Sequence, residues 1–220
     1  MCTWENSERI PLVLASGSPR RRRLLSVMGL SFQTTVPAID ESAGEGEKPE
    51  ALARRLSLLK ARAAAEAYAD AIIIAADTLV VCGGSVLGKP ADASEAREML
   101  VMLRGRQHRV LSGVALYDAT RRRQSVQIVK TMVYMRDYTE AEIRRYVASG
   151  EPMDKAGAYA IQDQDFSPVA RIDGCYTNVV GLPLCHLYRM LADWDIEIPI
   201  RPLTCCPLAV GAGCSLAERL

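Results

Sequence analysis

The sequence lacks any long apolar segment. No stretch reaches the roughly 18 apolar residues that a transmembrane helix needs, so we expect no membrane partner. Residues Met1–Ile10 contain three charged side chains and no apolar run, a pattern unlike that of a secretory signal. With 220 residues, of which 49% are hydrophobic and 24% charged, the composition is typical of a soluble, single-domain globular protein. These features predict a cytoplasmic location.

The sequence also lacks the cysteine spacing of zinc sites and disulfide frameworks. Its seven cysteines are an odd number, are scattered, and form no Cys-x-x-Cys motif. We therefore interpret them as reduced thiols, as expected in the cytoplasm.

An excess of charge of either sign is missing too, because the formal net charge is only +1. A nucleic-acid-binding module is one alternative, resting on the arginine runs Arg20–Arg23 and Arg121–Arg123. No aromatic residues are interleaved with these runs, and the net charge gives no general attraction to phosphates. We therefore expect no nucleic-acid partner, and any affinity for phosphate must come from a local cluster.

Several signatures of nucleotide-binding folds and hydrolytic triads are absent. There is no Gly-x-x-x-x-Gly-Lys-Ser/Thr loop and no Gly-x-Gly-x-x-Gly motif, which argues against a P-loop NTPase and a Rossmann dehydrogenase. The chain has only two histidines and no serine in a nucleophile elbow. A serine hydrolase is therefore poorly supported.

What the sequence does contain is a buried strand followed at once by an acid. Ile72–Ile74 is typical of a strand buried on both faces, and we expect Asp77 to lie at the tip of this strand. An unpaired buried carboxylate is costly, so Asp77 indicates a metal, a cation or proton transfer. The alternative is an acid that caps a turn. Lys89, within Gly88-Lys89-Pro90, brings a cation on a stiff loop.

A second cluster of polar residues stands near the N-terminus. The apolar run Pro11–Ala15 predicts a strand, and Pro19 and the arginines after it predict a helix capped by Ser18. The free N–H groups and the positive dipole of such a helix start favour anion binding. The sequence therefore predicts a phosphate site here, whereas Arg22 and Arg23 fit a solvated surface.

The remaining patterns predict alternating helices and strands. We expect a strand over Phe32–Val36, a mobile acidic loop around Asp40-Glu41, a helix from Pro49 that carries Lys60, a helix after Asp92, a hairpin of His108–Tyr117 with Ser125–Met135, a helix from Thr139 to Ser149, a polar loop over Glu151–Asp165 containing Lys155 and Gln162, and a last helix after Pro183.

Taken in order, these segments resemble one known family. The motifs are Ala15-Ser16-Gly17-Ser18-Pro19-Arg20-Arg21, Asp40-Glu41, Ala76-Asp77-Thr78, Gly88-Lys89-Pro90, Lys155-Ala156-Gly157-Ala158-Tyr159 and Asn178-Val179-Val180-Gly181-Leu182-Pro183. Their order and spacing are similar to those of the Maf family of nucleoside triphosphate pyrophosphatases. The resemblance covers residues 11–199, which leaves 1–10 as an N-terminal extension and 200–220 as a tail that is poorly ordered or part of an interface.

The resemblance implies a fold, an activity and a set of site residues. The fold would be α/β, an elongated mixed sheet of the Maf and inosine-triphosphatase type with two lobes and a central cleft. The enzyme would hydrolyse a nucleoside triphosphate to the monophosphate and pyrophosphate with a divalent metal, Mg²⁺ or Mn²⁺, and would form a homodimer. Asp77 matches the proton acceptor, Glu41 and Asp77 would face the metal, and the substrate would meet Ser16, Arg20, Arg21, Lys60, Thr78, Lys89, Lys155 and Gln162.

The resemblance also bears on the choice of nucleotide. Arg20, Thr78 and Gln162 match positions tied to substrate choice, and the sequence around Gln162 resembles the branch that acts on dTTP and UTP. A neutral amide can both donate to and accept from a pyrimidine edge. Cys175 departs from the serine that is more usual there. The alternatives are a 7-methyl-GTP or other modified-nucleotide pyrophosphatase, and a non-catalytic nucleotide-binding regulator of cell division.

Overall fold

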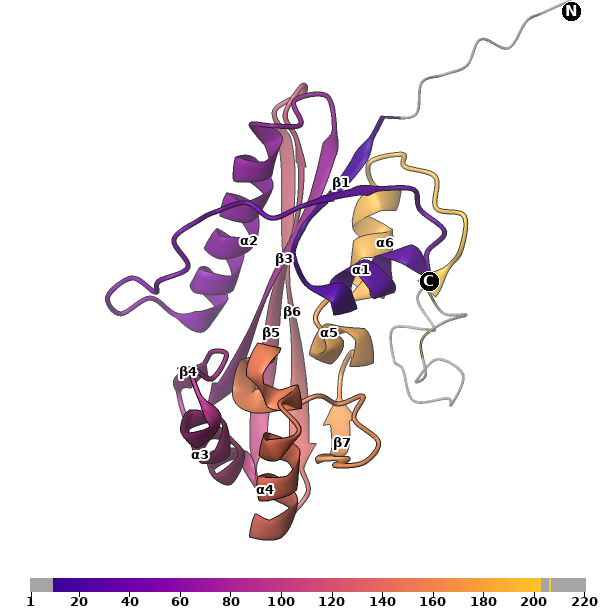
Figure 1. Cartoon of the computed structure of the whole chain (residues 1–220). Helices are drawn as coiled ribbons and strands as arrows, with labels where there is room; N and C mark the ends of the chain where they lie inside the picture. The colour runs from indigo at the N-terminus through magenta and orange to yellow at the C-terminus, as the bar shows by residue number, and fades with distance from the viewer. Residues whose placement is uncertain (1–9, 203–205, 207–220) are drawn as a thin grey trace, which may run out of the picture.

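The computed structural model describes residues 10–202 and 206, and shows one seven-stranded mixed sheet with helices on both faces (Figure 1). The strands are β1 (Leu12–Ala15), β2 (Gln33–Thr35), β3 (Ile72–Cys82), β4 (Ser85–Leu87), β5 (Gln107–Asp118), β6 (Arg123–Met135) and β7 (Val169–Asp173). The helices are α1 (Pro19–Ser26), α2 (Pro49–Ala65), α3 (Ala93–Leu103), α4 (Glu140–Ala148), α5 (Tyr176–Val180) and α6 (Leu184–Ala192), with short 3₁₀ helices η1 (Glu151–Asp154) and η2 (Ala156–Ala158).

The sheet has the order β2-β1-β3-β5-β6-β7, with β4 paired to β3. Strands β2, β1 and β3 run parallel, and all other pairs are antiparallel. The predicted long hairpin is present as β5 and β6, and it follows the length of the molecule (Figure 1). In the described part of the chain, no helix is long and apolar enough to cross a membrane.

Alternate residues of the central strands face different helices, because successive side chains of a strand point to opposite faces. Ile73 and Ala75 pack with Ala61 and Ala64 of α2, whereas Ile74 packs with helices α1 and α6 on the other face. These contacts form one lobe. It is covered by α2 on one face of the sheet and by α1 and α6 on the other.

A separate core surrounds the far end of β3, β5 and β6. Val80, Val110 and Val133 pack there with Leu100 of α3 and Ile143 of α4. Figure 1 shows α3 and α4 at the opposite end of the hairpin from α2. The molecule thus has two lobes that share one sheet, as the resemblance implied.

Most predicted elements are present, and the helix caps follow the predicted chemistry. The Ser18 hydroxyl accepts a hydrogen bond from the Arg21 N–H, and Thr139 and Glu142 form a complete capping box at α4. The Asp92 side chain caps α3 by accepting a hydrogen bond from the Glu95 N–H.

One prediction about the central strand was wrong. Asp77 does not lie at the tip of its strand, because β3 continues to Cys82. The reason is long-range pairing: β5 matches β3 residue by residue from Ile72 to Val81, and this ladder carries the strand past the acid. Asp77 therefore belongs to the sheet itself, where its backbone pairs with Gly113 of β5.

Other parts of the sequence held structure that the patterns did not predict. The short strands β4 and β7 and the helix α5 were missed, and the polar loop over Glu151–Asp165 contains η1 and η2. The proposed extension 1–10 and tail 200–220 lie almost wholly outside the described residues, so these boundaries stay a prediction.

Candidate active site

Asp77 lies in the middle of β3 with its side chain on the face covered by α2. Its neighbours on that face, Ala75 and Leu79, both pack against α2. Asp77 is only 5% exposed, and its Oδ1 accepts a hydrogen bond of 2.6 Å from Lys60 Nζ. The buried carboxylate is therefore compensated by the ammonium group of the helix that covers it.

A glycine allows α2 to come this close to the sheet. Gly113 pairs with Asp77 across the β3–β5 ladder, and a Cβ atom at Gly113 would lie 2.1 Å from the Ala53 carbonyl oxygen of α2. Such a separation is far below van der Waals contact, so any side chain at this position would push the helix outward. The approach of α2 at Gly113 brings Lys60, two turns further along the helix, to Asp77.

Lys60 also reaches the loop that precedes α2. Its Nζ lies 2.8 Å from Glu41 Oε1, so one ammonium joins Glu41 and Asp77. Partial burial alone would raise the pKa of Glu41. The hydrogen bond and charge of Lys60, with the charges of Lys89 and Arg21, outweigh burial and lower that pKa. Two carboxylates and several cations thus meet at one point, and both acids are on the predicted metal side.

Arg21 links the start of α1 to β3 and to the loop after α5. Its Nε donates to the Gly181 carbonyl at 2.9 Å and its Nη2 to Thr78 Oγ1 at 3.0 Å. Its Nη1 lies 3.4 Å from Ser16 Oγ. Burial lowers the pKa of Arg21, and the charge of nearby Asp77 acts against this effect. Arg21 is therefore held in a fixed orientation beside the Asp77 cluster.

Thr78 follows Asp77 in β3 and so points to the opposite face of the sheet. Its hydroxyl oxygen contacts Arg21, the Gly181 carbonyl at 3.3 Å and the Ser112 hydroxyl at 2.8 Å. Sequence reasoning missed Ser112, which lies directly opposite Thr78 in the β3–β5 register. A serine in the otherwise apolar run Val110–Tyr117 was the available signal. In the structure, Thr78 supports Arg21, while its predicted part in base selection stays a prediction.

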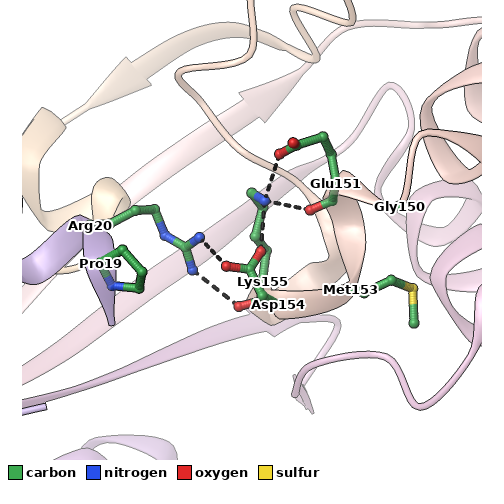
Figure 2. A pocket seen from close by; sticks show the side chains of 7 residues that line it. All are labelled: Pro19, Arg20, Gly150, Glu151, Met153, Asp154 and Lys155. Carbon is green, nitrogen blue, oxygen red and sulfur yellow. Dashed lines mark hydrogen bonds and ion pairs between the residues drawn. The ribbon is translucent and has the colours of Figure 1, made fainter. Parts of the chain in front are cut away.

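A second cluster surrounds the pocket between the two lobes (Figure 2). Arg20 reaches across from α1, and its Nη1 lies 2.6 Å from Asp154 Oδ2 while its Nη2 donates to the Asp154 carbonyl at 3.1 Å. Lys155 Nζ contacts Asp154 Oδ1 at 2.7 Å, and also the carboxylate and carbonyl of Glu151. The pocket has a volume of about 460 Å³ and is lined by Pro19, Arg20, Gly150, Glu151, Met153, Asp154 and Lys155.

Sequence reasoning missed the acids of this pocket. Asp154 and Glu151 already neutralise the two cations that were expected to meet the substrate. The partial burial of Asp154 acts to raise the pKa of its carboxyl, but hydrogen bonds and charge from Lys155 and Arg20 lower it. Both acids stand beside the Lys155 motif in sequence. The pairing of Asp154 with Arg20 depends on the fold, which brings together residues 134 positions apart.

Two predicted site residues, Lys89 and Gln162, have exposed side chains. Lys89 is exposed, and its loop is fixed to the Lys155 motif by a 3.0 Å hydrogen bond from the Gly157 N–H to the Gly88 carbonyl. Gln162 is exposed in a turn after Tyr159. Within the described residues, no hydrogen bond joins Gln162 to either cluster, so its predicted part in base selection is untested by this geometry.

The fold and the site together define an α/β protein with a buried carboxylate and arginines at a helix start, features suited to phosphate chemistry. The family model described as Maf-like protein matches residues 11–194, and the chain belongs to this family.

Relatives with curated names share nearly half of their residues with this chain. A dTTP/UTP pyrophosphatase of Pelotomaculum thermopropionicum is 49% identical over 85% of this chain and 98% of the relative. One from Dictyoglomus thermophilum is 47% identical over 82% and 94%. A third, from Thermomicrobium roseum, is 48% identical over 90% and 94%.

Proposed function

We propose that this protein hydrolyses dTTP and UTP to the nucleoside monophosphate and pyrophosphate. The observation that carries the proposal is the nearly full-length similarity to relatives named dTTP/UTP pyrophosphatases, at 47–49% identity. The geometry supports the same chemistry, because Lys60 joins Asp77 to Glu41 and the charges of both acids act on nearby Arg21. A reaction that attacks a phosphate needs a base and several cations in such an arrangement.

Asp77 would accept the proton of the water that attacks the α-phosphorus. Its Oδ1 is held by Lys60, whereas its Oδ2 accepts no hydrogen bond from the described residues. A carboxylate with one fixed oxygen and one available oxygen is suited to a general base. Lys60 keeps this side chain oriented and compensates its charge while the nucleotide binds.

The arginines and lysines would stabilise the charge that develops on the leaving pyrophosphate. Arg21 is oriented in advance by Gly181 and Thr78, so little reorganisation is needed during the reaction. Arg20 and Lys155 line the pocket between the lobes, and a triphosphate would compete there with Asp154 for their donors.

The donor set is compatible with a divalent metal, Mg²⁺ or Mn²⁺. Glu41 and Asp77 already share the cation Lys60, so a site between them attracts positive charge. The described residues contain no group of three or more His, Cys, Asp or Glu side chains that could hold a metal. Mg²⁺ commonly binds through one or two carboxylates together with substrate phosphates, which suits this pair. When bound, the metal would neutralise phosphate charge and acidify water.

Base selection, assembly and location complete the proposal. Arg20, Thr78 and Gln162 would contribute to the choice of a pyrimidine, Arg20 from the pocket wall, Thr78 beside Arg21 and Gln162 from the exposed turn. We further propose that the protein is a cytoplasmic homodimer.

A panel of nucleoside triphosphates tests this function directly. The purified protein is incubated with dTTP, UTP, CTP, GTP and 7-methyl-GTP, each with Mg²⁺ or Mn²⁺, and pyrophosphate release is measured. We expect the highest kcat/KM with dTTP and UTP. Preference for 7-methyl-GTP would replace the proposed substrate, and no pyrophosphate from any nucleotide would refute the proposed activity.

A further inference from the structure

The loop between β2 and α2 carries Glu41 to the active site, yet it has almost no buried surface of its own. Every residue from Asp40 to Gly46 is exposed, and the loop contains Gly44 and Gly46. The sequence predicted that this segment is mobile. The surface ion pair of Glu41 with Lys60 is too weak to hold such a loop alone, because the Glu41 side chain is 59% exposed.

A single arginine of α2 attaches this loop to the helix. Arg55 Nε donates to Glu47 Oε1 at 2.8 Å, and its Nη2 donates to Glu47 Oε2 at 2.7 Å. The same Nη2 donates to the Ser42 carbonyl at 2.8 Å. Two-pronged contacts between guanidinium and carboxylate are stronger and more directional than single ones. Arg55 therefore binds the loop at two points. One is Ser42, which is next to Glu41, and the other is Glu47, which is close to the start of α2.

The loop adds its own hydrogen bonds to this attachment. Glu47 Oε2 accepts a hydrogen bond from the Gly44 N–H at 3.0 Å, and Asp40 Oδ1 accepts one from the Ser42 N–H at 2.9 Å. The backbone that follows Glu41 is thus held at Ser42 and Gly44 by the side chains of Asp40, Glu47 and Arg55. The Arg55 hydrogen bond lowers the pKa of Glu47 to about 2, so the pair stays ionised at neutral pH.

We propose that Arg55, acting through Glu47 and Ser42, is a positioning residue that holds Glu41 against Lys60 beside Asp77. The inference rests on the proposed function, since Glu41 serves as a metal-side acid only if the site processes a metal-bound nucleotide. The same helix carries both Arg55 and Lys60. The loop is consequently attached to α2, the helix whose Lys60 also holds the Asp77 side chain.

The variant Arg55→Ala tests the inference, with Arg54→Ala as matched control. Arg54 is the neighbouring residue on the same helix, but it donates to the Val126 carbonyl of β6 and, within the described residues, forms no hydrogen bond or ion pair with the loop. We expect Arg55→Ala to raise the KM for metal-bound dTTP about tenfold, the size expected for loss of one charge-assisted contact, with kcat nearly unchanged. Arg54→Ala should leave both constants as in the wild type.

A double variant separates positioning from a general structural effect. If Arg55 acts through Glu41, then Arg55→Ala combined with Glu41→Gln raises KM no further than Glu41→Gln alone. The variant Arg55→Lys keeps the charge but cannot form the two parallel hydrogen bonds of a guanidinium. Its KM should lie between those of Arg55→Ala and the wild type. Additive effects in the double variant would overturn the inference, as would a fall in kcat with KM unchanged.

Hydrogen exchange of the peptide over 40–48 provides a readout that does not depend on turnover. It should speed up in Arg55→Ala and stay unchanged in Arg54→Ala. Unchanged exchange in Arg55→Ala overturns the attachment, and faster exchange without a change in KM overturns the positioning role. Lack of activity in the wild type would instead refute the proposed function and, with it, a role for Arg55 in that reaction.

Discussion

The two clusters of the site differ in how they are held. Asp77 and Lys60 lie on β3 and α2, elements fixed by the core, and their charged groups are largely buried. Arg20 and Lys155 instead pair with acids of a short 3₁₀ segment, and the Asp154 side chain is 57% exposed. The first cluster is therefore rigid, whereas the second can exchange its internal partners for those of a ligand.

This difference suggests a division of labour. A base must be held close to the reacting atoms, because small displacements cost much of the rate. Contacts that select a substrate can be made and broken, since their partners are replaced when the ligand binds. We infer that chemistry depends on the Asp77 cluster and that substrate choice depends on the Arg20–Asp154–Lys155 cluster. The predictions below test this division.

The largest effect is expected at Asp77. The variant Asp77→Asn keeps an oxygen for Lys60 but cannot accept a proton, so kcat should fall about 10²- to 10⁴-fold. Nucleotide binding, measured by calorimetry with dTTP and Mg²⁺, should be largely kept. Asp70→Asn, an exposed acid outside the site, serves as control.

The same variant separates an enzyme from a non-catalytic regulator of cell division. A regulator would keep its biological effect in Asp77→Asn. Turnover close to that of the wild type would contradict the role of Asp77 and remove the basis of the division of labour.

Much of the first cluster was predictable because its signals are local. Asp77 after the apolar run Ile72–Ile74 indicates a site for chemistry. Ser18 before Pro19 and the arginines indicates the start of a helix. Both patterns consist of neighbouring residues. What pattern reasoning could not supply is the long-range pairing. β5 carries β3 beyond Asp77, and the close approach of α2 at Gly113 brings in Lys60. Lys60 itself entered the site through the family resemblance, since a lysine on a helix is most often a solvated residue.

The second cluster was less predictable for a related reason. Lys155 and Arg20 were expected to be free for substrate, but Asp154 pairs with both. The pairing of Asp154 with Arg20 requires α1 and η1 to meet across the two lobes, which no local pattern encodes. Similarly, the acidic loop around Glu41 was predicted to be mobile from its composition. Its attachment through Arg55 depends on a charge pair whose members are eight residues apart, across a helix start.

The second prediction concerns His108, which is buried beside Tyr159 in the lobe that carries Lys155. His108 is 2% exposed, its Nε2 lies 2.8 Å from the hydroxyl of Tyr159, and its Nδ1 has no hydrogen-bond partner. Burial lowers the pKa of His108 to about 4, from an ordinary value of 6.5. The unfolded chain therefore binds the proton more tightly, and folding stability is lost as the pH falls from about 6.5 to 4.

The expected loss over that range is roughly 3 kcal/mol from this residue. Urea unfolding at several pH values measures it, and His108→Phe, which cannot titrate, should flatten this part of the profile. Hydrogen exchange should also show that the segment 155–159 loosens in acid before β3 and α2 do. An unchanged pH slope in His108→Phe would show that other groups cause the acid sensitivity.

The smallest effect is expected at Asp154, where the two clusters should separate most clearly. The variant Asp154→Asn removes the charge that competes with substrate phosphates for Arg20 and Lys155. Because the Asp154 side chain is 57% exposed, KM for dTTP should fall by no more than about fivefold, as expected for an ion pair open to solvent on one side. The kcat should stay unchanged, since Asp77 and Lys60 make no contact with Asp154. Steady-state kinetics with dTTP, UTP and CTP measure both constants, with the exposed Asp165→Asn as control.

If Asp154 also orients Arg20 for base selection, the ratio of kcat/KM for dTTP and UTP to that for CTP should fall in Asp154→Asn and not in Asp165→Asn. A lower kcat with KM unchanged would mean that this acid serves the chemical step, and that the two clusters act as one.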